Sequence, residues 1–405
     1  MPSLPSPPKT LIDALAAAAL SAQGKTQVQI AEALDLSQSA VSRLLNRKDV
    51  LPYINIERRF LWDEFPEPFQ QEIRRRMSHR EIGDRVARLA REHNQPAPAV
   101  HVVPMGESRE PGKQFDAFAP PAAMALRDLL EDVRGRVGVA WGSTIWYTVQ
   151  ALRSILPQRP IRRQLPIDFV PLCGDPLIDS LESYADRTSS RIVSELSKAV
   201  NGDELRPAWL GLVPAFIPRT FKGRDIRVID RLIDLVPQYP RIFGRRIPQP
   251  GPAVAPMVGD LHMIITAAGP AKRPLGFGKN PLLGLTEAQS RTLAENIHGD
   301  IGGVLLPRLA HASGKDGGEP APDPLVRDLM ARWTGLKIEH LKECSRRAFA
   351  EGGKSRPGVT LLSFGTDHVE VVLEAVRRGL VNQLIIGSDL EEALAEVLPR
   401  GSAGA

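Results

Sequence analysis

Residues 26–49, TQVQIAEALDLSQSAVSRLLNRKD, hold two short helix patterns separated by only two or three residues. The first pattern has one apolar face, formed by Val28, Ile30, Ala31, Ala33 and Leu34. Ser37 is a good N-cap for the second pattern, whose apolar residues are Ala40, Val41, Leu44 and Leu45. Two short helices joined this tightly must cross steeply, which predicts a helix-turn-helix unit.

The outer side of the second helix carries hydroxyl, amide and guanidinium groups, which can bind base edges and phosphates. Asp35 stands in the turn, where a left-handed backbone is needed and Asp is better tolerated than most residues. The simpler alternative is a helical hairpin with a solvated face. The apolar pattern, the tight turn and the polar face together favour DNA binding, with candidate residues Thr26, Gln27, Ser37, Gln38, Ser39, Ser42, Arg43, Arg47 and Lys48.

The composition allows two domains in 405 residues, and 42% hydrophobic residues are enough for a sizeable core. The net charge of +5, from 52 basic and 47 acidic residues, is a slight basic excess. DNA affinity must therefore come from local placement of charge and from pairing of two copies of the chain. Cys173 and Cys344 are too far apart in sequence to indicate a disulfide framework or a metal site.

Targeting signals are not evident in the sequence. No apolar run approaches a membrane span, and the start MPSLPSPPKT lacks a signal-peptide core, so we expect a cytoplasmic protein.

Three regions are expected along the chain. Residues 1–56 form the helix-turn-helix domain, in which 50–56 could be a short wing strand. Residues 57–97 form a linker and a connecting helix with an apolar stripe at Ile82, Val86 and Leu89. The arginines at 74–76 are expected to be a solvated charge run rather than a phosphate contact. Residues 98–405 form the third region.

In this third region short apolar runs alternate with helical patterns, which predicts an α/β domain with a mainly parallel sheet covered on both faces. The expected strands are residues 99–104, 136–140, 167–173, 209–216, 260–269, 358–364 and 383–387.

Ligands of such sheets bind outside the carboxyl ends of the strands, which directs attention to the stretch VGVAWGSTIW. A strand ends at Ala140 and a helix follows a loop that contains Gly142, Ser143 and Thr144. The glycine allows close approach, and helix-start amides with two hydroxyls suit a phosphate or a polyhydroxylated ligand. A plain N-cap turn would also favour Ser and Thr.

Further polar residues follow or precede other strands. The stretch FVPLCGD ends with Cys173, Gly174 and Asp175, whose carboxylate could hold sugar hydroxyls or simply serve the turn. Cys173 is better explained as a small buried residue than as a nucleophile. Asp260 stands at a strand start, and Asp300 lies near paired glycines.

These motifs together resemble the SorC-type, DeoR-related sugar-binding transcriptional regulators. The resemblance rests on IAEALDLSQSAVSRLL, VGVAWGSTI, FVPLCGD, DLHMIITAAG, HGDIGG and EVVLEAVRRGLVNQLIIGSDLEEAL, and covers residues 9–397. It implies an effector domain similar to ribose-5-phosphate isomerase and glucosamine-6-phosphate deaminase that serves as a sensor. It also implies effector contacts at Gly142, Ser143 and Thr144, with Asp260 and Asp300 in the same pocket, and dimers or tetramers that bind operator DNA.

Two stretches depart from the family pattern. Residues 57–78 do not match its wing and linker. Where many members have a lysine that reaches an effector phosphate, this chain has Asp367 and His368, which favours an unphosphorylated sugar. No cofactor or metal is expected.

Two other functions were weighed. An isomerase- or deaminase-like enzyme would use Asp260, His262, His298 and Asp300. It would have no use for a DNA-reading module. A repressor without a ligand would use the α/β domain only for oligomerisation.

Overall fold

The computed structural model describes residues 9–22, 25–47, 67–105, 113–161, 165–175, 187–202, 210, 213–248, 255–272, 284–309, 321–352 and 355–399. The chain divides into two compact units, Met1–Asp84 and Arg85–Ala405. The division falls inside one continuous helix, α4 (Glu67–Glu92), so residues of the expected connecting helix belong to both units.

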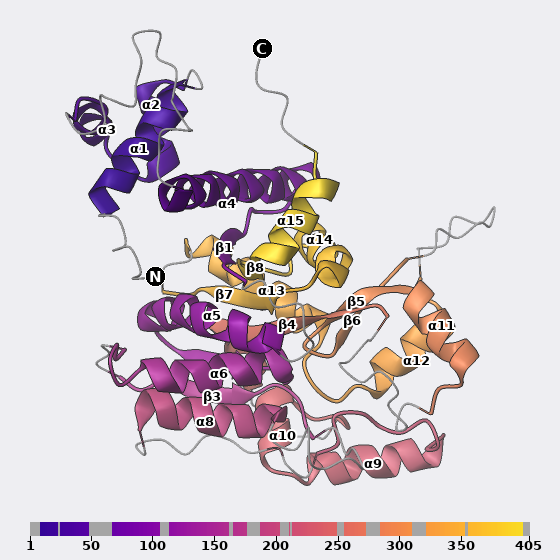
Figure 1. Ribbon diagram of the computed structural model, residues 1–405. Coiled ribbons are helices and arrows are strands. Elements are labelled where there is room, and N and C mark those ends of the chain that lie inside the picture. The colour runs from indigo at the N-terminus through magenta and orange to yellow at the C-terminus, as the bar shows by residue number, and fades with distance from the viewer. Residues whose placement is uncertain are drawn as a thin grey trace. The chain divides into compact units, whose positions relative to one another are not determined.

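The first unit contains the helices α1 (Lys9–Ala22), α2 (Gln27–Leu34) and α3 (Gln38–Leu45) (Figure 1). Its core consists of small and branched apolar residues, Ala17, Ile30, Ala31 and Val41, with partly buried leucines packed around them. This helical unit agrees with the expected helix-turn-helix domain. The expected wing at 50–56 lies outside the described residues.

The second unit is built on an eight-stranded sheet, and its fold class is the expected α/β class. The parallel part has the order β1-β8-β7-β4-β2-β3. Its strands are β1 (Ala99–Val103), β2 (Arg136–Val139), β3 (Asp168–Pro171), β4 (Met263–Pro270), β7 (Gly358–Ser363) and β8 (Gln383–Gly387). The far half of β4 also pairs antiparallel with β5 (Ile297–Ile301), which pairs with β6 (Val304–Pro307).

Helices lie on both faces of the parallel sheet (Figure 1). On one face α5 (Lys113–Asp132), α6 (Ser143–Ile155) and α8 (Ser189–Asn201) enclose the larger core, whose members include Leu126, Ile145, Phe169 and Ile192. The helices α13 (Ile338–Ala350), α14 (Val369–Arg377) and α15 (Ser388–Val397) contact β7, β4 and β8 respectively. A sheet that is covered on both faces needs strands that are almost wholly apolar, and the sequences of these strands meet that requirement.

A smaller lobe surrounds the β5–β6 hairpin. Its helices are α11 (Glu287–Glu295) and α12 (Pro324–Arg332), and its core includes Trp141, Phe216, Leu305 and Trp333. Among the described residues, the other helices of this unit are α9 (Arg224–Asp234), α10 (Gln238–Phe243) and the short 3-10 turns η4 (Met257–Asp260) and η7 (Thr366–His368).

The expected strands are confirmed with one exception. Within 209–216, the described residues make only isolated bridges, Asp175 with Pro214 and Phe216 with Trp333. Pro214 has no amide to donate, which disfavours a regular strand in this stretch. No helix among the described residues combines the length and the apolarity needed to span a membrane.

Candidate functional site

The α2–α3 pair is fixed by side-chain caps at both helix starts. The Thr26 hydroxyl accepts from the Gln29 amide at 3.3 Å, and the Gln29 side chain accepts from the Thr26 amide at 2.9 Å. The Ser37 hydroxyl accepts from the Ala40 amide at 3.2 Å and so caps α3. These caps satisfy amides that a short helix would otherwise leave unpaired.

The turn between the two helices depends on Asp35. Its backbone is left-handed, with φ 53° and ψ 50°, and its amide donates to the Ala31 carbonyl. The Leu36 amide donates to the same carbonyl at 2.9 Å, so α2 ends at Leu34 and α3 begins after three intervening residues, at Gln38. The sequence reading of this turn is confirmed.

The polar side of α3 is open to solvent as expected. Gln38, Ser39 and Arg43 are exposed, and Ser42 is half-buried. Arg43 Nε donates to the Ser39 carbonyl at 3.3 Å, and Ser37 and Ser39 share a hydroxyl contact of 3.0 Å. The guanidinium of Arg43 is therefore held along the outer side of the helix.

Other candidates in this unit have different surroundings. Arg47 Nη1 donates to the Thr10 carbonyl of α1 at 3.0 Å, so it helps to hold the three helices together. Gln27 is exposed at the start of α2, and Lys48 lies outside the described residues. Val28 was expected on the buried face of α2 but is 50% exposed, because α2 buries Ile30 and Ala31 instead.

The loop after β2 lies at the carboxyl edge of the sheet. Gly142 has φ 117° and ψ 163°, a conformation that a residue with a Cβ rarely adopts, and open space lies where its Cβ would be. α6 begins directly after it at Ser143. The loop therefore combines open space beside Gly142 with the start of a helix, the kind of place where an anion or a polar ligand can bind.

Arg187, which the sequence reading missed, reaches this loop from the segment before α8. Its Nη1 donates to Ser143 Oγ at 2.7 Å, and its guanidinium carbon lies 5.4 Å from the centre of the Tyr147 ring. Its carbonyl accepts from the Gly142 amide at 3.2 Å. The loop thus has a cation beside its hydroxyl. The signal available in the sequence was an arginine directly before the helix cap Thr188.

The start of α8 also ties the loop to the end of β3. Ser189 Oγ donates to the Val139 carbonyl at 2.6 Å and accepts from the Leu172 amide at 2.8 Å. This bond pair fixes the ends of the two neighbouring strands against each other. It brings Asp175, which follows β3, to the same edge of the sheet as Ser143.

Asp175 is half-buried, and its Oδ1 atom is buried without a hydrogen-bond partner among the described residues. Burial raises the pKa of this carboxyl from 3.8 to about 6. A hydrogen bond from Thr188 has the opposite, smaller effect and lowers the pKa. Cys173 is 1% exposed, and burial raises the pKa of its thiol above the ordinary range. A Cβ on Gly174 would lie 2.0 Å from the Val213 carbonyl, so this glycine serves backbone packing.

Asp300 lies on β5 and is 4% exposed. Its Oδ1 accepts from the Gly303 amide at 2.9 Å and closes the β5–β6 turn. A Cβ on Gly302 in this turn would lie 2.8 Å from Ala140 Cβ and 2.5 Å from Thr266 Oγ1. The hairpin turn therefore lies against the loop that follows β2, and Asp300 shapes that turn.

His368 follows β7 at the same edge of the sheet. Its side chain is 16% exposed, and its Nδ1 lies 2.9 Å from Asp367 Oδ1. In the sheet order β4 separates β7, the strand before His368, from β2, the strand before the Gly142 loop. Phe364 and Phe115 fill part of the space between them and reach Tyr147 of α6.

Asp260 is not at this edge. It ends η4, before β4, and so lies at the amino ends of the parallel strands. Its Oδ1 pairs with Arg347 Nη1 at 3.3 Å, and Arg356 Nη2 is 3.9 Å away. The expectation that Asp260 shares a pocket with Gly142 disagrees with this position, because the length of β4 separates them.

Comparisons with known proteins give no match to a family model and no match among curated proteins. Solved structures do resemble the chain. A DeoR family transcriptional regulator from Listeria monocytogenes has 17% identity and a TM-score of 0.49, covering 77% of this chain and 98% of its own. The full-length sorbitol operon regulator SorC from Klebsiella pneumoniae has 17% identity and a TM-score of 0.49, covering 95% of this chain and 98% of its own.

A transcriptional regulator from Streptococcus pneumoniae has 18% identity and a TM-score of 0.48, covering 79% of this chain and 98% of its own. The first two of these structures are named as a DeoR family regulator and as SorC.

Proposed function

We propose that this chain is a DNA-binding transcriptional regulator whose affinity for its operator is controlled by a small carbohydrate effector. The observation that carries the proposal is the α2–α3 pair, with a cap at each helix start and the left-handed Asp35 between them. This geometry leaves Gln38, Ser39 and Arg43 on one exposed side of α3. These side chains can donate to and accept from base edges in the major groove.

The carboxyl edge of the sheet supports the effector part of the proposal. The open space at Gly142, the start of α6 and the Ser143 hydroxyl suit sugar oxygens or a phosphate. The preference for an unphosphorylated sugar depended on a missing cation near His368. Arg187 supplies a cation beside Ser143 instead, which supports a phosphorylated effector with its phosphate at this loop. Asp175 follows β3 at the same edge of the sheet and is the candidate acceptor for sugar hydroxyls.

The enzyme alternative has less support. Its four candidate side chains are divided between opposite edges of the sheet, because Asp260 and His262 precede β4. His298 Nδ1 lies 3.0 Å from Glu370 Oε1, and Asp300 holds the Gly303 amide. A general base and its partner must lie within hydrogen-bond reach of one substrate, so Asp260 and His262 cannot act together with His298 and Asp300 of β5.

The DNA-binding part is tested by selecting an operator from random duplexes and footprinting variants on it. We expect Gln38→Ala and Arg43→Ala to lose about 1–3 kcal/mol of discrimination at a defined base pair, since each would remove a base contact. Arg91→Ala, an exposed arginine of α4, is the matched control and should leave the footprint unchanged. Identical footprints and affinities for both α3 variants and the control would contradict the proposal.

The effector part is tested by thermal unfolding with matched pairs such as fructose and fructose 6-phosphate. We expect the phosphate to give the larger rise in Tm, and Arg187→Gln to remove the difference between the pair. Thr144→Val removes one donor and should weaken the response about fivefold while leaving operator binding without effector nearly intact. Arg153→Gln, at the far end of α6, is the control. Normal responses in both loop variants would move the effector site elsewhere.

A further inference from the structure

A second cavity lies in the smaller lobe, between β6, α12 and the start of α13. Its volume is about 60 Å³. Its walls are largely apolar, with Phe216, Leu305, Leu329, Met330, Trp333 and Leu336 among them. One water needs about 10–15 Å³, so the space admits a molecule of about five non-hydrogen atoms. An apolar cavity of this size suits a short alkyl group.

Lys337 lines the same cavity and is the residue directly before α13. Its Nζ donates to the Met330 carbonyl at 3.2 Å and to the Trp333 carbonyl, which are left open at the end of α12. Among the residues that the structure describes, these carbonyls are its hydrogen-bond partners. An ammonium has three donors, so one remains for a group inside the cavity.

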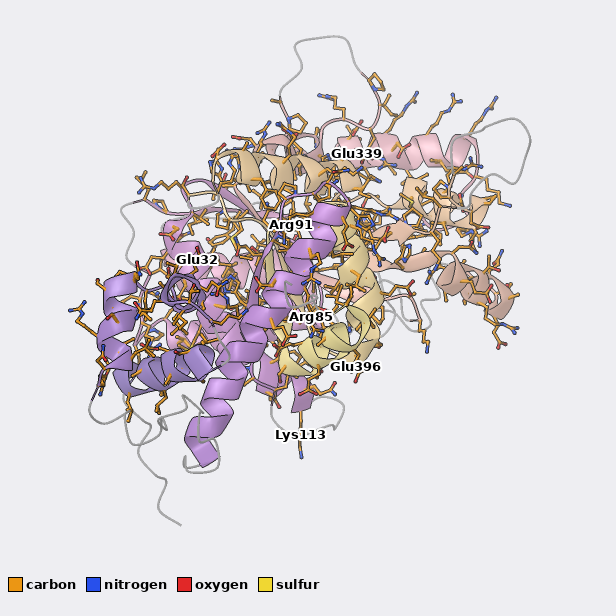
Figure 2. All side chains as sticks on the ribbon, turned by 90° about the horizontal axis from the view of Figure 1, so that it is seen from above. Glu32, Arg85, Arg91, Lys113, Glu339 and Glu396 are labelled. Atoms are coloured by element: carbon orange, nitrogen blue, oxygen red, sulfur yellow. The ribbon has the colours of Figure 1, made fainter. Side chains whose placement is uncertain are left out.

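The groups around Lys337 compensate the charge of its ammonium only weakly. Burial, and next Arg246, lower the pKa of Lys337 to about 8, while Glu339 raises it. Glu339 (labelled in Figure 2) also lines the cavity, but it is exposed to solvent, and Arg246 is itself paired with Asp230. Burial lowers the pKa of His340. A buried cation gains most from an anion placed beside it.

We infer that this cavity is a small-molecule site, separate from the Gly142 loop, for a short branched carboxylic acid. The carboxylate pairs with Lys337 Nζ, and the alkyl group lies against Phe216, Leu305 and Met330. Trp333 forms one wall, and its ring centre is 5.7 Å from that of Trp141, the residue before Gly142. A ligand here therefore lies one aromatic contact away from the proposed effector loop.

The test uses the full chain with isobutyrate as probe and isobutyramide as a neutral molecule of the same shape, at an ionic strength held constant with chloride. We expect isobutyrate to change tryptophan fluorescence saturably and to raise Tm, with millimolar affinity because the ligand is so small. Isobutyramide should bind at least about tenfold more weakly, since it cannot pair with the ammonium. Isobutyrate affinity should fall about tenfold from pH 7 to pH 9 as Lys337 loses its proton.

Three variants decide the outcome. Lys337→Met should remove the preference for isobutyrate, and Met330→Trp should fill the cavity and abolish binding without touching the lysine. Lys342 is an exposed lysine of α13, and the Lys342→Met variant should bind isobutyrate as the parent chain does. If Lys337→Met does not fold because α12 loses its cap, Met330→Trp still tests the site. Equal binding of acid and amide, or isobutyrate binding by the filled variant, would overturn the inference.

Discussion

At the residue scale, the α2–α3 turn depends on the backbone of Asp35. A left-handed residue with a Cβ costs roughly 1–2 kcal/mol, and Asp lowers this cost through its short polar side chain. In return, two amides in succession, those of Asp35 and Leu36, reach the Ala31 carbonyl and end α2. A β-branched residue at this position would force the backbone out of the left-handed conformation. The orientation of α3 relative to α2, and with it the position of Gln38 and Arg43, would then change.

Asp175 gives a prediction of pH-dependent stability. Its pKa is raised in the folded chain from 3.8 to about 6, so the proton it binds stabilises the fold below pH about 4, and this contribution is lost as pH rises through about 6. Asp175→Asn should therefore raise the free energy of unfolding at pH 7.5 by about 1–2 kcal/mol, after allowance for partial solvent screening. The gain should largely disappear at pH 4.

Urea unfolding at the two pH values measures this difference, and Glu392→Gln, an exposed carboxylate of α15, is the control. A variant that is less stable than the parent at pH 7.5 would contradict the prediction, because the hydrogen bond from Thr188 would then outweigh the cost of burying the carboxylate.

At the scale of elements, α15 ends against a buried arginine of α4. Arg85 is 5% exposed, and its Nη1 donates to the Ala395 carbonyl at 2.6 Å and to the Leu398 carbonyl at 3.1 Å (Figure 2). These carbonyls have no partner within the helix, and they carry the negative end of its dipole. Arg85→Met keeps the apolar stem but leaves them unpaired, so we expect a loss of about 2–3 kcal/mol in unfolding free energy.

Arg91 offers the matched control on the same helix. It is exposed, and its Nε donates to the Ala87 carbonyl of its own helix at 3.2 Å. Arg91→Met should change the free energy of unfolding by less than about 0.5 kcal/mol in the same urea titration. Equal stability of the two variants would mean that the α15 carbonyls find other partners.

The elements of this fold differ in how far sequence alone predicts them. The caps and turn of α2–α3 and the apolar parallel strands follow from local chemistry, so Asp35, Ser37 and the strand before Gly142 were predicted correctly. The β5–β6 hairpin was missed because its glycine-rich stretch 299–303 interrupts any apolar alternation. Arg187 was missed because its meeting with Ser143 depends on α8 starting beside the end of β2. Asp260 was assigned to the wrong edge of the sheet because its motif was considered without the direction of β4.

At the scale of the whole molecule, α4 is the element that the two compact units share. It is one unbroken helix, and the division between the units follows Asp84 within it. Ile82, Val86 and Leu89 are buried within a single chain, so this apolar stripe is not a free surface for pairing. On the proposed function, an effector can alter operator affinity only if it binds more tightly to one of two conformations of the chain, one that binds the operator well and one that binds it poorly. The difference in binding free energy is about 1–3 kcal/mol in typical cases.

We expect the chain to bind its operator as a dimer or a larger symmetric assembly. The net charge of +5 provides little attraction for DNA, and a single α3 reads only a short half-site. Two copies related by a two-fold axis would bind two half-sites, so the operator selected from random duplexes should be a pseudo-palindrome with half-sites about one helical turn apart. Light scattering at micromolar concentration should give at least twice the chain mass. A monomer both with and without operator DNA, or an operator with a single half-site, would contradict this expectation.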